Sequence, residues 1–183
     1  MTTTLIVVLV VVVLILLVLG AVAVMNRRRQ ELQSRFGPEY DRTVEESGDR
    51  RAAEKELQAR TQRREELDIK PLDADRRAGF ADRWRQAQES FVDRPGVAVR
   101  EADVLVTTVM AERGYPVENF DQQARDVSVD HADVVEHYRA AHDIADRESR
   151  HQASTEDLRT AMVHYRSLFA RLLDDGARDR TGR

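Results

Sequence analysis

The fold of this chain is decided by residues 154–176, STEDLRTAMVHYRSLFARLLDDG, which carry its cleanest amphipathic pattern. Apolar residues recur there at steps of three and four, so they share one face of a helix. We expect Ser154 or Thr155 to cap the start of this helix and Gly176 to end it, with residues 176–183 as a disordered tail. The apolar face consists of Leu158, Ala161, Met162, Tyr165, Leu168, Phe169 and Leu172.

The same helical spacing recurs in four earlier segments. We expect Pro95-Gly96 to form a turn, Gly114 and Pro116 to stop one helix, and Asp130 to cap the next. No segment alternates apolar and polar residues as a half-buried strand does, so the sequence predicts an all-α fold with a small helical bundle over residues 71–175. The four apolar faces are Phe80, Trp84, Ala87 and Phe91; Ala98, Ala102, Leu105, Val106, Val109 and Met110; Val117, Phe120, Ala124 and Val127; and Val134, Val135, Tyr138, Ala141, His142 and Ala145.

Residues 26–70 are dominated by Glu, Arg, Gln and Ala. Phe36-Gly37-Pro38 indicates a turn before a helix that has proline in its first turn. Apolar residues are scattered after this turn, so a helix there buries little of itself, and sustained a/d heptads are missing. We therefore expect a charged juxtamembrane helical stalk rather than a coiled coil, with a weak point at Ser47-Gly48. Ile69-Lys70-Pro71-Leu72 interrupts the stalk, because the residue before a proline disfavours helical geometry.

The run from Leu5 to Met25 holds 21 residues without a charge, and Asn26-Arg27-Arg28-Arg29 closes it. About 20 apolar residues are what a helix needs to cross the hydrocarbon core of a bilayer. The sequence therefore predicts that residues 5–25 form a transmembrane helix in contact with the lipid bilayer. Residues 1–4 would be a short extracytoplasmic N-terminus.

A cleaved secretory signal is the alternative for this run, because Ala21-Val22-Ala23 has the small-x-small form of a cleavage site. The lack of a basic n-region and the length of the run favour an uncleaved anchor. Arg27, Arg28 and Arg29 are the topogenic residues, since basic residues close to a span stay on the cytoplasmic side. We expect a single-pass protein of the cell membrane with its N-terminus outside and its C-terminal body cytoplasmic. A body that faces outside is the alternative if the arginines are overruled.

The charge of the chain is balanced, with 29 basic and 33 acidic residues of mixed order and a formal net charge of -4. Nucleic-acid binding needs a concentrated basic face, so the composition argues against a nucleic-acid partner. Cysteine is absent, which excludes disulfides, thiolate catalysis and cysteine-based zinc sites. We expect no cofactor.

Four motifs follow the apolar run: RFGPEYDR at 35–42, RGYP at 113–116, VSVDH at 127–131 and HYRAAH at 137–142. In this combination the chain resembles a group of uncharacterised actinobacterial proteins that are described only as membrane or secreted proteins. The resemblance spans most of the chain beyond the apolar run. It implies one domain of a recurring type, and it brings no catalytic residues with it.

The sequence contains no recognisable active-site motif. Its 8 glycines are scattered, without a Gly-x-Gly cradle, a Walker-type loop or a nucleophile elbow. Four of the 5 histidines fall in the carboxylate-rich stretch from Asp130 to His151, but no two of them are three or four residues apart. Glu148-x-x-His151 is a single copy of a motif that carboxylate di-metal bundles use twice. Two further pairs sit one turn apart and are as readily intrahelical partners as metal ligands: Asp133 with His137, and His142 with Asp146.

The tripeptide His-Tyr-Arg occurs twice, at 137–139 and 164–166. If the two helices pack antiparallel, the tyrosines would fill one core layer, with the histidines and arginines along its edge. A three-residue match also arises by coincidence between similar amphipathic helices. The other interpretation is a polar ridge that recognises a partner and responds to histidine charge near neutral pH. This candidate polar ridge consists of His137, Arg139, His164 and Arg166.

The anchor, the stalk and the packable body predict a membrane-tethered helical binding or scaffolding module. Its partner would be an unidentified protein. Assembly into a homo-oligomer is the other option for the partner. The alternative is a metal-binding or hydrolytic helical domain that uses the region from Asp130 to His151.

Overall fold

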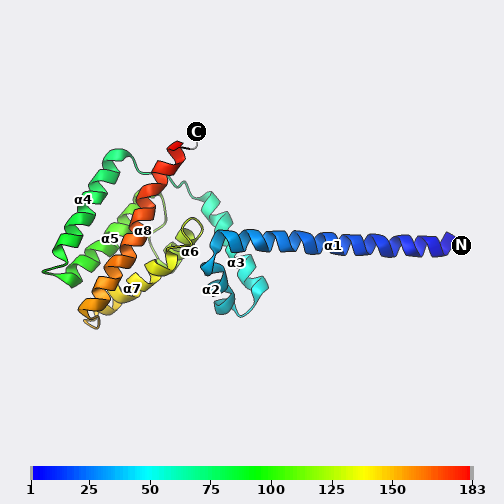
Figure 1. Cartoon of the computed structure of the whole chain (residues 1–183), viewed down its shortest axis with the longest axis horizontal. Coiled ribbons are helices and arrows are strands. Elements are labelled where there is room, and N and C mark those ends of the chain that lie inside the picture. The colour runs from blue at the N-terminus through cyan, green and yellow to red at the C-terminus, as the bar shows by residue number, and fades with distance from the viewer. Residues whose placement is uncertain (1, 182–183) are drawn as a thin grey trace. The chain divides into compact units, whose positions relative to one another are not determined.

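The structure, a computed structural model, describes the backbone of residues 2–181 and the side chains of residue 9 and residues 14–174. All regular elements in this part of the chain are helices, which confirms the all-α prediction (Figure 1). The helices are α1 (Thr2–Phe36), α2 (Pro38–Ser47), α3 (Arg50–Glu66), α4 (Ala74–Ser90), α5 (Pro95–Arg113), α6 (Phe120–Ser128), α7 (Val135–Ser149) and α8 (Thr155–Thr181).

The chain divides into two compact units, and the first, Met1–Leu57, contains α1, α2 and the start of α3. Gly37 separates α1 from α2 with a φ of 47°, a left-handed conformation that favours glycine. Pro38 opens α2 as predicted. Gly48 ends α2 in the αL conformation, so the weak point predicted at Ser47-Gly48 is a helix end.

Glu54 on α3 joins the three helices of the first unit. The Tyr40 hydroxyl on α2 donates to Glu54 Oε1 at 2.8 Å, and Arg29 Nε on α1 lies 4.0 Å from the same oxygen. Burial raises the pKa of Tyr40. Within the predicted stalk, a few apolar side chains are buried where the helices meet, whereas most side chains of α2 and α3 are exposed. The buried apolar residues of this unit are Leu32, Phe36, Tyr40, Ala53 and Leu57.

The apolar run lies within α1. Among the residues that the structure describes, no helix is both long enough and apolar enough to cross a membrane. Much of the predicted span, residues 5–8 and 10–13, and the predicted N-terminal residues 1–4 have side chains outside the described residues.

The second unit, Gln58–Arg183, is the helical bundle. It begins earlier than the predicted boundary at residue 71, because the end of α3 is ion-paired to α6 and the residues that follow it. Arg63 Nε lies 3.1 Å from Oδ1 of Asp126, whose side chain is fully buried. Arg64 pairs with Asp130.

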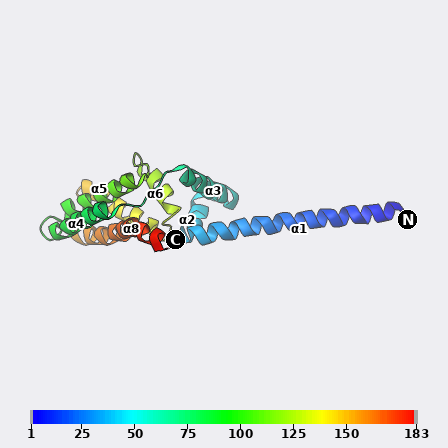
Figure 2. The same cartoon turned by 90° about the horizontal axis from the view of Figure 1, so that it is seen from above.

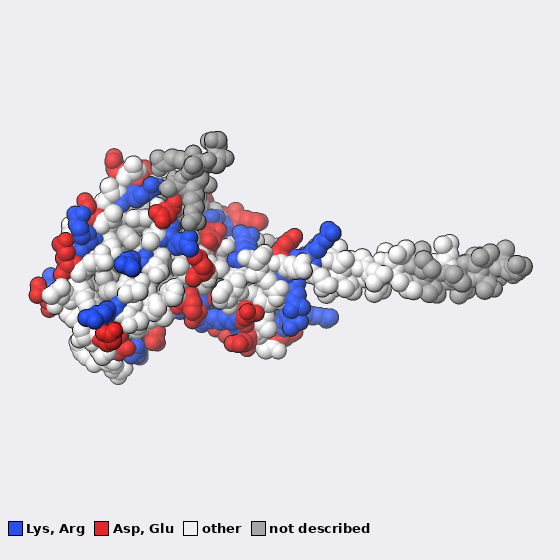
Figure 3. All heavy atoms as spheres, in the orientation of Figure 1, with Lys and Arg blue, Asp and Glu red and all other residues white. Residues whose placement is uncertain are grey.

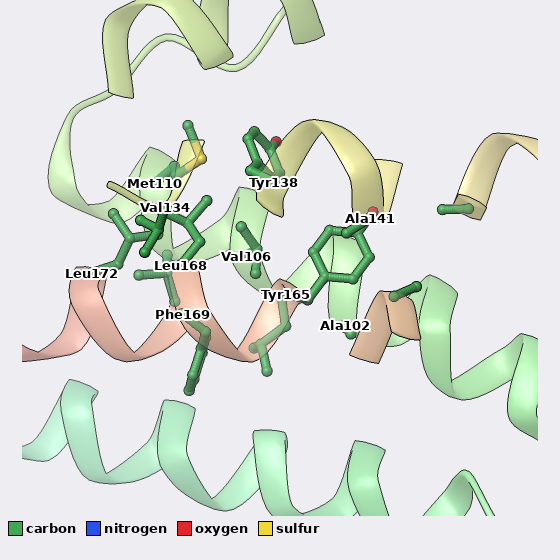
Figure 4. Close-up of a cluster of buried hydrophobic side chains, with 14 of the residues drawn as sticks. Ala102, Val106, Met110, Val134, Tyr138, Ala141, Tyr165, Leu168, Phe169 and Leu172 are labelled. Carbon is green, nitrogen blue, oxygen red and sulfur yellow. The ribbon is translucent and has the colours of Figure 1, made fainter. Parts of the chain in front are cut away.

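The predicted apolar faces form the core of the bundle. All the residues predicted for the apolar faces of α5 and α8 are buried, and Figure 4 shows several of them converging with Tyr138 of α7. The two views in Figures 1 and 2 place α4 and α8 on one face of the bundle and α5 behind them. Trp84 of α4 stacks on Phe169 of α8 with ring centroids 4.7 Å apart, so the only tryptophan of the chain is a core residue.

Helices α7 and α8 are antiparallel. Arg147 near the end of α7 lies 3.5 Å from Asp157 near the start of α8, whereas Asp133 just before α7 pairs with Arg171 in the second half of α8. The connection ends in a capping box at the start of α8. Ser154 Oγ accepts from the Asp157 N–H at 3.1 Å, and the Asp157 carboxylate accepts from the Ser154 N–H at 2.9 Å. The predicted cap at Ser154 is confirmed.

Three predicted helix ends differ from the structure. Pro95-Gly96 is the first turn of α5 rather than a separate turn, because proline suits the first helical position. Asp130 does not cap α7, which begins at Val135, because its carboxylate is held by Arg64 and by the Tyr115 hydroxyl at 2.9 Å. Gly176 does not end α8, because the helix runs to Thr181. An interior glycine costs a helix about 1 kcal/mol. The predicted disordered tail is therefore helical up to Thr181, and residues 182–183 lie outside the described residues.

Candidate functional site

The repeated His-Tyr-Arg tripeptides meet where α7 and α8 pack. The rings of Tyr138 and Tyr165 are fully buried and meet edge to face, with centroids 6.3 Å apart and planes at 63°. The rings of His137 and His164 stack at 4.8 Å with planes at 18°. The tyrosines therefore pack against each other in the core and the histidines stack beside them, which is the part of the expected geometry that these ring contacts confirm.

Each buried tyrosine hydroxyl has an acceptor on a different helix. Tyr138 donates to Gln123 Oε1 of α6 at 2.9 Å, and Tyr165 donates to Asp103 Oδ1 of α5 at 2.7 Å. Burial, and then the nearby Asp103 carboxylate, raises the pKa of both tyrosines. Both hydroxyls therefore stay protonated donors at neutral pH.

Asp103 also faces His142 of α7. No motif in the sequence pointed to Asp103. His142 Nδ1 lies 3.6 Å from Asp103 Oδ1, with about a third of each side chain exposed. The imidazole stacks on Phe120 with centroids 3.6 Å apart. A distance of 3.6 Å is longer than a hydrogen bond, and in the described part of the chain no hydrogen-bond partner reaches the buried Nδ1. The only signal for Asp103 is indirect, since a buried tyrosine such as Tyr165 requires a polar partner.

This His142–Asp103 pair holds a partly exposed imidazole beside a carboxylate, which is one element of an acid–base site. A hydrolytic site also needs a nucleophile within hydrogen-bond reach of the imidazole. The polar and ring contacts described for His142 are those with Asp103 and Phe120. The arrangement therefore orients the imidazole without supplying a nucleophile.

The four residues of the candidate polar ridge do not form one surface. His137 and His164 stack, and burial together with the His137 charge lowers the pKa of His164. Arg139 lies 3.5 Å from Glu136 on its own helix. Arg166 lines a groove on the α4 side of α8, because side chains two positions apart on a helix point in nearly opposite directions.

The groove between α4 and α8 lies on the face of the bundle that Figure 3 shows, where uncharged atoms form a broad area crossed by separate basic side chains. Its apolar residues are Phe91, Met162 and Val163, and the Val163 side chain is 51% exposed. We call this set, with its polar flanks, the α4–α8 groove. It is lined by Gln88, Phe91, Arg159, Met162, Val163 and Arg166.

The stretch from Asp130 to His151 places its carboxylates against arginines. Asp133 pairs with Arg171 and Asp146 pairs with Arg150. Each carboxylate therefore interacts with an arginine rather than with the histidine one helical turn away, His137 or His142. Within the described residues, no group of three or more histidines and carboxylates is arranged to hold a metal ion. The contacts of these carboxylates are those of structural ion pairs. The other four carboxylates of the stretch also lie beside arginines: Asp130 beside Arg64, Glu136 beside Arg139, Asp143 beside Arg147 and Glu148 beside Arg100.

The apolar run on α1 has no protein cover where its side chains are described. Nine large apolar side chains between residues 14 and 25 are at least 48% exposed. Six of them, residues 14–19, are consecutive, so at 100° per residue they surround the helix completely. The predicted topogenic residues follow directly: Arg27 and Arg28 are exposed, and Arg29 lies beside Glu54.

Comparison of the chain with protein-family models, curated proteins and solved structures gives no match. The resemblance to uncharacterised actinobacterial proteins stays a prediction. Function is therefore argued from the residues described above.

Proposed function

We propose that the protein is a membrane-tethered helical binding module. In this proposal, residues 5–25 of α1 cross the bilayer and the bundle binds a protein partner. The observation that supports it most is the complete ring of exposed apolar side chains at residues 14–19.

A ring of exposed apolar side chains requires an occupant that surrounds the helix. Burying one Leu, Val, Ile or Met side chain is favourable by about 1.5–3 kcal/mol, so nine such side chains in water represent a large unfavourable term. A folded partner covers one stripe of a helix, whereas lipid covers every side. The uncharged run of 21 residues spans about 30 Å as a helix, close to the thickness of the hydrocarbon core.

Arg27, Arg28 and Arg29 support an orientation with the N-terminus outside and the bundle in the cytoplasm. Basic residues next to a span are retained on the cytoplasmic side. The absence of cysteine agrees with this orientation, because disulfides are a feature of proteins outside the cytoplasm.

The bundle supports binding better than catalysis. The carboxylates between Asp130 and His151 pair with arginines, and His142 lacks a nucleophile among its described contacts. The alternative metal-binding or hydrolytic function therefore has less support than a binding surface, and no specific observation favours it.

The experiment that tests the tether uses the natural absence of cysteine. Gln152→Cys lies at an exposed position between α7 and α8, and Thr3→Cys lies before the apolar run as the matched control. Intact cells that produce each variant are treated with a membrane-impermeant thiol reagent, before and after lysis. We expect Thr3→Cys to be labelled in intact cells and Gln152→Cys only after lysis.

Two outcomes would contradict the proposal. Labelling of Gln152→Cys in intact cells would reverse the orientation, and the mass of the mature chain would then show whether the run had been cleaved as a signal. Recovery of both variants in the supernatant after the membranes are sedimented would remove the membrane tether itself.

A further inference from the structure

The α4–α8 groove exists because the two helices touch through large side chains. Trp84 and Phe169 stack at 4.7 Å, with planes at 21°, and Figure 4 shows Phe169 projecting from α8. Beyond this pair, toward the C-terminal end of α4, Gln88 and Phe91 face Met162 across a groove with a volume of about 210 Å³. Two neighbouring helices that leave a groove between them offer the surface into which a third helix packs.

The groove lies beside two of the exposed apolar side chains of the bundle. Among the described residues of the bundle, the large apolar side chains that are exposed are Val92, Val104 and Val163. Val163 lines the groove, and Val92, which is 84% exposed, follows the groove residue Phe91 directly in the chain. Two of the three exposed side chains therefore belong to this end of α4 and α8, beside the half-buried Phe91.

The two charged side chains that line the groove are both arginines, Arg159 and Arg166. Arg166 makes no ion pair or hydrogen bond with any side chain that the structure describes, and Arg159 lies 3.3 Å from Glu156 on its own helix. The two arginines are seven residues apart on α8, which is about 10 Å along the helix axis. Carboxylates two turns apart on a docked helix have the same separation.

We propose that the α4–α8 groove binds an amphipathic helix of a protein partner, whose apolar face is flanked by Asp or Glu side chains. Its apolar side chains would contact Phe91, Met162 and Val163, and its carboxylates would pair with Arg159 and Arg166. This inference rests on the proposed binding function and names the chemistry of the partner. It also gives a role to Arg166, which the sequence pattern singled out as part of the polar ridge.

The test uses the full chain in lipid nanodiscs and two synthetic 18-residue peptides that lack tryptophan. Both carry leucine at helical steps of three and four, one with flanking glutamates and the other with flanking lysines. Binding is followed by fluorescence anisotropy of labelled peptide and by emission of Trp84, the only tryptophan, which lies one turn from Gln88. We expect the glutamate peptide to bind at least tenfold more tightly than the lysine peptide.

Three variants locate the site. Arg166→Glu should weaken binding of the glutamate peptide at least tenfold and strengthen binding of the lysine peptide, because the charge complementarity is reversed. Val163→Asp should abolish binding of the glutamate peptide. Val104→Asp changes an equally exposed valine, 58% against 51%, outside the groove, and should leave binding unchanged.

The groove assignment is overturned if both peptides bind equally, or if neither binds at a peptide concentration of about 1 mM. It is also overturned if Val104→Asp weakens binding as much as Val163→Asp does. It is also overturned if Val163→Asp changes only the oligomeric state, since a second copy would then be the occupant. Cysteine labelling of Thr3 and Gln152 tests the tether independently, so failure of the peptides and failure of the proposed membrane attachment are distinguishable.

Discussion

The ring of Tyr165 meets the ring of Tyr138 edge to face at 6.3 Å, and the two hydroxyl groups donate to different helices. Tyr138 reaches Gln123 on α6, and Tyr165 reaches Asp103 on α5. One pair of side chains on α7 and α8 therefore connects four helices. Aromatic pairs of this geometry add about 0.5–1.5 kcal/mol beyond the area they bury.

Tyr165→Phe should lower the free energy of unfolding of the bundle by about 1–3 kcal/mol, because the change keeps the ring but leaves Asp103 without its donor. Tyr40→Phe is the control, since Tyr40 lies in the first unit, Met1–Leu57. Urea unfolding followed by Trp84 emission measures both. A Tyr165→Phe bundle as stable as the natural one would show that the hydrogen bond to Asp103 contributes nothing.

The bundle should lose stability as the pH rises above about 10. Burial raises the pKa of Tyr115, Tyr138 and Tyr165, so the folded state keeps protons that the unfolded state releases near pH 10. The unfolded state then binds fewer protons, and the free energy of unfolding falls with pH. Thermal unfolding at pH 8, 10 and 11 measures the slope, and Tyr138→Phe should reduce it. Ionisation of all four tyrosines near pH 10 in the folded protein, seen by ultraviolet absorbance, would contradict this.

The bundle should also lose stability as the pH falls below about 6.5. Burial, and then the neighbouring His137, lowers the pKa of His164. As the pH falls through the ordinary histidine pKa of about 6.5, the unfolded state gains a proton that the folded state does not, and this continues until the pH passes the lowered pKa. His164→Gln should flatten the dependence of the melting temperature between pH 7 and 5. His151→Asn, at an exposed loop position, should leave it unchanged, and equal slopes for the two variants would be the contrary result.

Spacing along the sequence predicted the parts of the fold that depend on local periodicity. The apolar faces of α5 and α8 are buried as the pattern indicates, and the two tyrosines share a layer because both lie mid-face on antiparallel helices. Asp130 shows where such reasoning ends: its position favours a helix cap, but its carboxylate is held by residues 66 and 15 positions away in the chain. Asp103 could not be found either, because its neighbours Tyr165 and His142 come from other helices. Long-range polar pairing leaves no local pattern.

Gly114→Ala should destabilise the bundle by roughly 2–4 kcal/mol, because the backbone strain of a left-handed residue adds to a close contact. Gly114 has a φ of 99°, and a Cβ there would lie 2.6 Å from the carbonyl oxygen of Asp68. Gly79→Ala is the matched control. Gly79 lies inside α4 with nothing within 4 Å of a Cβ, so alanine should stabilise by about 0.5–1 kcal/mol. Thermal unfolding compares them, and shifts of the same sign would contradict the account.

If α1 crosses the bilayer as proposed, replacing Leu14 and Leu17 together by arginine should keep α1 out of the membrane. Each arginine near the centre of a span costs about 3 kcal/mol relative to leucine, so the pair opposes insertion by about 6 kcal/mol. Both leucines are more than half exposed, and no packing within the described protein is lost. Gln30→Arg, beyond the arginine cluster, is the control and should remain with the membranes after an alkaline wash. If α1 were instead exposed to water, the two arginines would leave the distribution between membrane and supernatant unchanged. A shift of the double variant from the membranes to the supernatant therefore indicates lipid around this helix, and an unchanged distribution indicates water.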